Sequence, residues 1–206
     1  MPSLFETLTQ SLGSNELGQL GQQIGADQAS TSTAVATALP MLIGALAHKA
    51  SQPQGAQAIA GALARDHDGS ILDNLQDYLG GGNTALNGAG QPAAAVDGAG
   101  ILGHLLGGQR GAVEQAVGQS SGLSAGSTAR LLELLAPLVM GSLGRNANSQ
   151  GLDASGLAGL LGQEHANLSQ SGALLSGFMS LLDSNHDGSV VDDVTNLASR
   201  FFGRSS

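Results

Sequence analysis

The chain has 206 residues, of which 41% are hydrophobic, so it is long enough to form one domain or two small ones around a core. Seven Lys and Arg stand against sixteen Asp and Glu, which argues against binding to nucleic acid or to anionic membrane surfaces, because both need clustered positive charge. The absence of cysteine excludes disulfides and thiolate chemistry and is compatible with the cytoplasm, where we expect the protein.

The N-terminal segment is predicted to form two short helices. Ser3 and Glu6 make a capping box in front of an apolar run, because each side chain can bind the backbone N–H of the other residue. Asn15 is expected to cap a second helix, which ends at Gly25. The start of the chain lacks the basic residues and long apolar run of a signal peptide, so we expect no targeting segment there.

A longer helix is predicted from about residue 28 to residue 48. Its apolar side chains recur at helical spacing, and Asp27 stands at the position of the N-cap. Pro40 falls inside the helix, where it removes one N–H and pushes against the carbonyl four residues earlier, so a kink is expected. The apolar stretch 34–47 is too short to span a bilayer comfortably, and we therefore expect a buried helix.

The run around Pro40 returns 97 positions later around Pro137, and the alignment needs no gap. Gly44 and Gly141 each follow the proline by one turn, where a missing side chain lets a neighbouring helix come close. Ser124 takes the N-cap position of the second central helix. The same offset aligns Leu8 with Leu105, Gly21 with Gly118, Gly25 with Gly122, Thr31 with Thr128 and Leu46 with Leu143. We therefore predict an internal duplication.

The predicted domain organisation is two helical repeats joined by a linker. Residues 1–80 form the first repeat, at the end of which Ser70 and Asp73 are read as another capping box. Residues 81–99 are rich in Gly and Ala and are expected to be a flexible linker that few contacts cross. Residues 100–206 form the second repeat, with an extra helix and a C-terminal loop and helix. Whether the repeats pack together stays open.

The C-terminal loop carries the one pattern that points to a metal ion. Residues 183–190, Asp-Ser-Asn-His-Asp-Gly-Ser-Val, fit the opening of a calcium loop, in which oxygen ligands alternate along the chain and glycine permits the turn. Ca²⁺ is accordingly the one cofactor that the sequence offers. The oxygen ligands would come from the side chains of Asp183, Asn185 and Asp187 and from the carbonyl of Ser189.

Two features favour a simpler interpretation of this loop as a connector between helices. The twelfth position holds Val194 instead of a bidentate acid, so Asp192 or Asp193 would have to substitute. The first copy of the element, at 66–73, has Ala64 where the first ligand should be. In the connector, the glycine ends one helix and the serine caps the next.

Several of these elements together resemble a known family. They are His-Asp-Gly-Ser-apolar-apolar-Asp at 67–73 and 186–192, Leu-Pro-Met-Leu-Ile-Gly-Ala-Leu at 39–46, and Ile-Leu-Gly-His-Leu-Leu-Gly-Gly at 101–108. In this combination the chain resembles the bacterial YidB-like proteins, an uncharacterised family (domain of unknown function 937). The resemblance covers most of the chain and implies an all-helical fold, but it implies no established activity.

No catalytic pattern is found in the sequence, and we expect no catalytic residue. The five histidines form no His-x-x-x-His pair, and neither a Gly-x-Ser-x-Gly elbow nor a Gly-x-x-x-x-Gly-Lys loop occurs. His67 and His186 recur in equivalent loops, which favours a capping role over catalysis. The acidic residues that we predict to lie on solvated helix faces are Glu114, Glu133 and Glu164.

The sequence predicts an all-α, internally duplicated, cytoplasmic and non-enzymatic protein that functions by interaction or self-assembly. Its partner would be another protein or a second copy, and neither nucleic acid nor a membrane. A largely uncharged surface favours self-association, with Tyr78, Phe201 and Phe202 as the first interface residues to test. The alternative is a divalent-cation-binding module, and an uncharacterised hydrolase ranks third.

Overall fold

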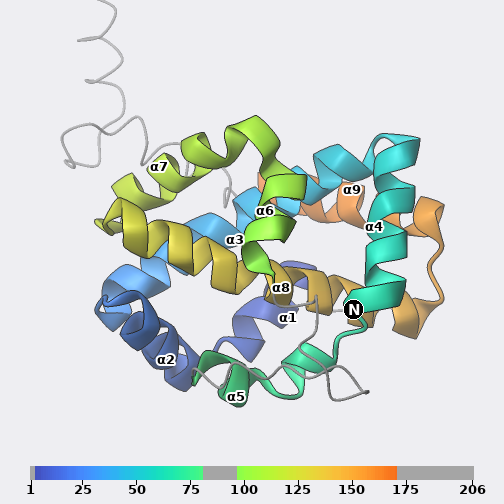
Figure 1. Ribbon diagram of the computed structural model, residues 1–206. Helices are drawn as coiled ribbons and strands as arrows, with labels where there is room; N and C mark the ends of the chain where they lie inside the picture. The colour runs from blue at the N-terminus through green and yellow to red at the C-terminus, as the bar shows by residue number, and fades with distance from the viewer. Residues whose placement is uncertain (1–2, 81–96, 171–206) are drawn as a thin grey trace, which may run out of the picture.

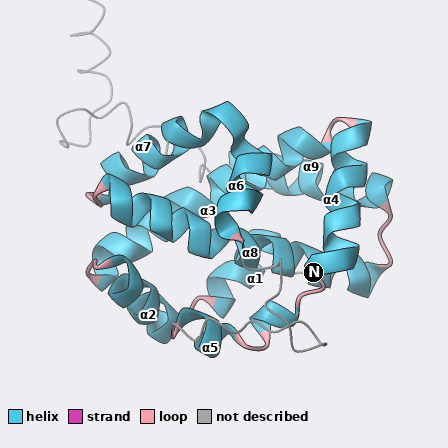
Figure 2. Ribbon diagram, viewed as in Figure 1, coloured by secondary structure: helices cyan, strands magenta, loops and turns pink. Residues whose placement is uncertain are grey.

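The computed structural model describes residues 3–80 and 97–170, and the regular structure in both ranges is entirely helical (Figures 1 and 2). The first range contains α1 (Leu4–Ser11), α2 (Ser14–Ile24), α3 (Gln28–Ala50), α4 (Pro53–Asp66) and α5 (Leu75–Leu79). The second range contains α6 (Gly98–Leu106), α7 (Arg110–Ser121), α8 (Ala125–Gln150) and α9 (Ala154–Gln170). No strand occurs in these ranges, so the prediction of an all-α fold is confirmed.

Local capping explains where several helices begin. Ser3 Oγ accepts from the N–H of Glu6 at 3.0 Å, and Glu6 Oε2 accepts from the N–H of Ser3 at 2.9 Å, which confirms the capping box. Asp27 Oδ1 accepts from two N–H groups in the first turn of α3, at 2.9 Å each. Ser124 caps α8 by accepting from the N–H of Ser127 at 3.2 Å. These caps are encoded locally, as the sequence indicated.

Two predicted caps are wrong. The N-cap of α2 is Gly13, and Asn15 lies inside the first turn because the helix begins at Ser14. Ser70 and Asp73 form no capping box, because Ser70 begins a short 3-10 turn that ends at Leu72. The N–H of Ser70 instead donates to Asp68 Oδ1 at 2.9 Å.

The two longest helices, α3 and α8, lie at the centre of the fold (Figure 1). Pro40 lies inside α3 and Pro137 inside α8, and both are buried. Thr31 and Thr128 are fully buried at matching positions, and each Oγ1 donates to the carbonyl of its N-cap residue, at 2.7 and 2.9 Å. This local likeness supports the duplication, which, like the kink at each proline, stays a prediction.

The helices of the two described ranges interlock in one hydrophobic core. α3 packs against α7, α8 and α9 from the second range, and α8 packs against α1, α2 and α4 from the first. The expectation of few contacts between the halves is therefore wrong, because each central helix is covered largely by helices of the other half. The linker prediction also extends too far, because α6 begins at Gly98, while residues 81–96 lie outside the described residues.

α3 is long and apolar enough to cross a membrane by length and composition alone. The ranges Gly98–Ser121 and Ala125–Gln150 pass the same test only as a pair bent by 110°. The core helix of a globular protein meets these criteria equally well. Because α2, α4, α7, α8 and α9 pack against α3, its apolar surface is used within the fold.

Glycines of α8 let the turn after α4 lie directly on that helix. A Cβ atom at Gly144 would stand 1.7 Å from the carbonyl oxygen of His67, and one at Gly141 would stand 2.4 Å from Ile71 Cγ2. Gly69, within the turn, has a φ of +100°, which a residue with a side chain rarely adopts. The turn is therefore held by close backbone packing that tolerates no added methyl group.

Arg145 of α8 binds the same turn through a hydrogen bond and an ion pair. Its guanidinium donates to the carbonyl oxygen of Gly69 at 2.7 Å and pairs with Asp73 Oδ1 at 2.7 Å. Asn148, one turn later, donates to the carbonyl oxygen of Asp68 at 3.4 Å. The end of α4 is thus fixed to the second half of the chain.

Gly144→Ala is expected to lower the free energy of unfolding by about 2 to 3 kcal/mol, because the new methyl group overlaps the backbone carbonyl of His67 and forces the backbone to shift. Urea unfolding followed by circular dichroism measures this. Gly159→Ala is the matched control: it lies in α9 with no atom within 4 Å of the added Cβ, and there alanine should stabilise by up to about 1 kcal/mol. Equal stability of Gly144→Ala and the wild type would contradict the packing.

Candidate functional site

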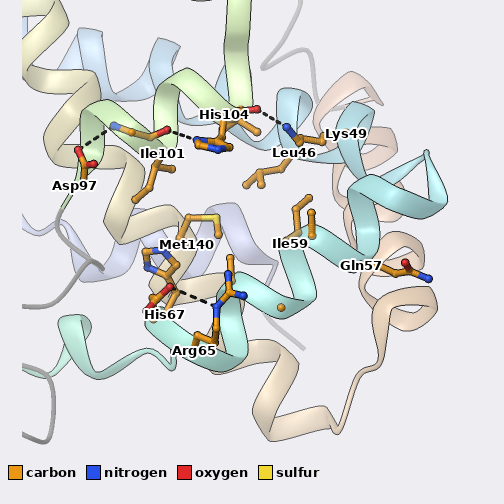
Figure 3. Close-up of a pocket in the computed structure, with 16 residues that line it drawn as sticks. Leu46, Lys49, Gln57, Ile59, Arg65, His67, Asp97, Ile101, His104 and Met140 are labelled. Carbon is orange, nitrogen blue, oxygen red and sulfur yellow. Dashed lines mark hydrogen bonds and ion pairs between the residues drawn. The ribbon is translucent and has the colours of Figure 1, made fainter.

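A groove of about 600 Å³ opens between α4 and α6 (Figure 3). Leu46 of α3 and Met140 of α8 are buried at its floor. Ile59 of α4 lines one wall, and Ile101 and Leu105 of α6, which are half-buried and one turn apart, line the other. The groove is therefore built from both halves of the chain and is apolar inside.

Small residues on α4 keep the groove open. Ala58, Gly61 and Ala62 line it, and no atom lies within 4 Å of a Cβ added at Gly61. At the opposite wall, Gly98 sets the start of α6 against α8, since a Cβ there would stand 1.8 Å from the carbonyl oxygen of Glu133. The gap thus follows from short side chains on one wall and from a backbone contact that positions the other.

Charged and polar side chains of both signs border the groove. Lys49 Nζ donates to the carbonyl oxygen of His104 (Figure 3). Asp97 caps α6 by accepting from the N–H of Gly100 at 2.9 Å. Arg65 lies 3.9 Å from Asp66, and because Arg65 is largely exposed, the pair stabilises little. Two cations and two anions border the groove, so its rim carries no net charge that would select a small ion.

His67 is the most deeply buried polar residue of the groove lining, with 6% of its surface exposed. Its Nδ1 atom is buried and has no hydrogen-bond partner. Burial lowers the pKa of His67, and the carboxylates of Asp66 and Asp68 oppose this shift without reversing it. The imidazole is therefore held in its neutral form.

The structure does not reach the predicted calcium ligands. Asp183, Asn185, Asp187, Ser189 and Asp192 lie outside the described residues. Within residues 3–80 and 97–170, no group of three or more His, Asp or Glu side chains is arranged to hold a metal ion.

The first copy of the loop, at residues 66–73, lies within the described residues. Its oxygen atoms accept hydrogen bonds from other groups of the protein. Asp68 accepts from the N–H of Ser70, and this bond lowers the pKa of the Asp68 carboxyl. The carbonyl oxygen of Gly69 accepts a hydrogen bond from the guanidinium of Arg145. The first copy is arranged as a helix connector.

The prediction of a solvated helix face is wrong for Glu164, whereas Glu114 and Glu133 are partly exposed and pair with an arginine. Arg110 binds Glu114 at 2.6 Å and Glu133 at 2.8 Å, which ties α7 to α8. Glu164 is only 5% exposed, and its Oε2 atom has no hydrogen-bond partner. It shares the buried face of α9 with Leu157, Leu161 and Leu168. That spacing of four, three and four residues was a readable signal for burial.

Of the three predicted interface residues, only Tyr78 lies in a described range. Its side chain is half-buried, and its hydroxyl donates to the carbonyl oxygen of Leu134 at 3.2 Å, which joins α5 to α8. Burial raises the pKa of Tyr78. Phe201 and Phe202 lie outside the described residues, and a role of all three in an interface stays a prediction.

Comparison with known proteins gives one match. The model of a family described as "Bacterial protein of unknown function (DUF937)" matches residues 6–146, from α1 into α8. This range contains all of the residues that line the groove. No curated protein and no solved structure matches the chain.

The buried histidine predicts how stability depends on pH. Because the pKa of His67 is lower in the folded chain than its unfolded value of about 6.5, the unfolded chain binds a proton that the folded chain does not. Stability should therefore fall as the pH drops from about 7 to 5. The carboxyls with lowered pKa values, Asp27, Asp68 and Asp153, lose their contributions only below about pH 4.

Urea midpoints of the wild type and of His67→Leu, measured between about pH 7.5 and 5, test this prediction. His67→Leu should flatten the pH dependence, whatever its effect on stability at pH 7.5. His48→Gln changes an exposed histidine and serves as the control. An unchanged slope in His67→Leu would show that another group governs this range.

Proposed function

The chain belongs to the DUF937 family of bacterial proteins of unknown function, and we propose that it is a non-enzymatic helical protein that binds another protein chain, including a second copy of itself, through the groove between α4 and α6. The observation that carries the proposal is the apolar interior of this groove. Leu46, Ile59 and Met140 form a continuous part of the core that opens to the surface there.

The groove matches the way in which proteins receive a helix. An amphipathic helix binds by laying its apolar face between two helices of its partner, and small residues on one wall let it approach closely. Here Ala58 and Ala62 lie on α4, and Ile101 and Leu105 on α6, each pair at a spacing of one turn. Lys49 and Asp97 at the rim can pair with opposite charges on a bound polypeptide that carries both signs.

Binding is favoured over hydrolysis by the surroundings of the two groove histidines. A histidine base needs a nucleophile within hydrogen-bond reach. His104 Nδ1 instead lies 3.0 Å from the carbonyl oxygen of Gly100 in its own helix, and His67 Nδ1 is buried without a partner. A hydrolase accordingly remains the third-ranked candidate.

We place the protein in the cytoplasm, with neither nucleic acid nor a membrane as its partner. The net charge of −9 and the absence of cysteine support this assignment. The use of α3 as a core helix supports it as well.

We also propose that the two halves arose by duplication and that their central helices bend at the prolines. Gly25 and Gly122 end the helices before α3 and α8 with φ values of +69° and +72°, as expected of equivalent positions. The groove, between α4 of one half and α6 of the other, then depends on the way the halves interlock.

Light scattering across a concentration series tests the groove as a contact surface. The average mass of the full chain should rise with concentration, and Ala58→Glu should abolish the rise, because it places a charge on an exposed wall position without disturbing the core. Ala166→Glu makes the same change at an exposed position of α9 outside the groove lining and should behave as the wild type. A strictly monomeric wild type, or equal behaviour of both variants, would contradict the proposal.

The alternative function, divalent-cation binding, rests on the Asp-x-Asn-x-Asp-Gly pattern at 183–188. If this loop binds Ca²⁺, calorimetric titration of the full chain should give heat and a raised Tm, and Asp187→Ala should lose both. Asp68→Ala alters the first copy of the element and is the control, since that copy acts as a connector. No heat and no change in Tm at millimolar Ca²⁺ would remove the alternative.

A further inference from the structure

His67 is a buried polar side chain of the groove lining that the fold leaves without a partner (Figure 3). Only 6% of its surface is exposed, and its Nδ1 atom is sealed from solvent with no hydrogen-bond partner. The other ring nitrogen, Nε2, makes no hydrogen bond with the described residues either, but it is not sealed and therefore contacts the open groove. Because nearly all buried polar groups in proteins are paired, an unpaired histidine at the wall of a cavity indicates that a ligand binds there.

We propose that the groove binds an uncharged, largely apolar small molecule whose hydroxyl group forms a hydrogen bond with Nε2 of His67. This site goes beyond the proposed binding of a polypeptide and does not depend on it. A neutral imidazole carries a proton on one nitrogen and a lone pair on the other, and a hydroxyl group both donates and accepts. A hydroxyl therefore matches Nε2 in either tautomer, whereas a carbonyl, which only accepts, matches one of them.

The interior of the groove has the size and composition of a site for such a molecule. Its volume of about 600 Å³ lies within the range of small-molecule sites, about 300 to 1,000 Å³. Leu46, Ile59 and Met140 supply a buried apolar surface, and no atom lies within 4 Å of a Cβ added at Gly61, so the space beside α4 is open. An alkyl chain fits this lining, and each methylene that leaves water there should strengthen binding about threefold to fourfold.

The charged side chains around the groove argue against a charged ligand. Lys49 Nζ already donates to a carbonyl oxygen of α6, and Asp97 caps that helix. Arg65 and Asp66 lie 3.9 Å apart and are exposed, so water and each other solvate both. Burial lowers the pKa of His67 and keeps the ring itself neutral. An ionised headgroup at His67 would lose its hydration without gaining a counterion, which opposes binding.

Displacement of the fluorescent dye Nile red from the full chain compares three ligands that share one alkyl chain: nonanol, nonanoate and nonylammonium. At about pH 8 the acid and the amine are ionised and His67 is neutral. Nonanol should bind at least about tenfold more tightly than either ion, because only the ions lose the hydration of a charge. From hexanol to nonanol, the affinity should rise about threefold to fourfold per carbon. Equal or tighter binding of either ion would overturn the assignment of an uncharged ligand, and no displacement by nonanol would overturn the site.

Two glycines with open surroundings locate the bound alcohol. Gly61→Leu places a side chain in the groove from its α4 wall and should weaken nonanol binding at least about tenfold. Gly159→Leu makes the same change on α9, outside the groove lining, where the added Cβ also meets no atom within 4 Å, and should bind nonanol as the wild type does. Circular dichroism checks that both variants keep their helices. If both variants bind nonanol alike, the ligand lies elsewhere and the inference is wrong.

The hydrogen bond to His67 has a spectroscopic readout. In nuclear magnetic resonance, the imidazole nitrogen resonances of His67 should shift when nonanol is added, whereas those of His48, which is exposed and outside the groove lining, should stay unchanged. His67→Phe keeps a ring of similar shape without the nitrogens and should weaken nonanol binding about threefold to tenfold, while the gain per carbon is retained. Unchanged resonances of His67, or equal affinity of His67→Phe and the wild type, would overturn the role of His67.

Failure of this inference is distinguishable from failure of the proposed function. If Ala58→Glu abolishes association while nonanol does not displace the dye, the groove binds a polypeptide and only the inference fails. If Ala58→Glu and Ala166→Glu associate alike while nonanol binds to the wild type but not to Gly61→Leu, the inference stands and the proposed function fails.

Discussion

Close backbone packing on α8 is the constraint on which the rest of this structure depends. Two segments from opposite sides of the groove lie on this helix: Gly98, at the start of α6, lies against the carbonyl of Glu133, and the carbonyl of His67, at the end of α4, lies against Gly144. Neither contact has room for a methyl group. Because both walls are placed by the same helix, α8 sets the distance between them, and the groove follows from that distance.

Because of this arrangement, part of the interlocked core is accessible from the surface. An apolar strip of the core, including Leu46 and Met140, opens between two helices whose facing residues are small on one side and aliphatic on the other. The balanced charges around it give no preference for a small ion, and the Nδ1 atom of the neutral, buried His67 has no hydrogen-bond partner. A site of this composition is suited to a helical polypeptide, which is why binding rather than chemistry is proposed for this member of its family.

The parts of the fold that neighbouring residues determine could be predicted from the sequence. The parts that depend on contacts between residues far apart in the sequence could not. The capping box of Ser3 and the cap formed by Asp27 were readable because a few neighbouring residues determine them. Interlocking of the halves was missed because the close approach of Gly144 to the carbonyl of His67 pairs positions far apart in sequence, and glycine-rich composition alone indicated a linker. Burial of Glu164 was readable from the spacing of α9, but its charge favoured a solvated interpretation. The groove itself left no sequence signal, because it is a gap between helices.

The most direct test of the account measures the distance across the groove. Spin labels at Ala58→Cys and His104→Cys, on α4 and α6, can be placed without interference because the chain has no other cysteine. Electron paramagnetic resonance should give one narrow distance distribution in the wild-type background, and Gly98→Ala should broaden or shift it, because α6 must move away from α8. If Gly98→Ala leaves the distribution unchanged, backbone packing on α8 does not set the groove, and the account is contradicted.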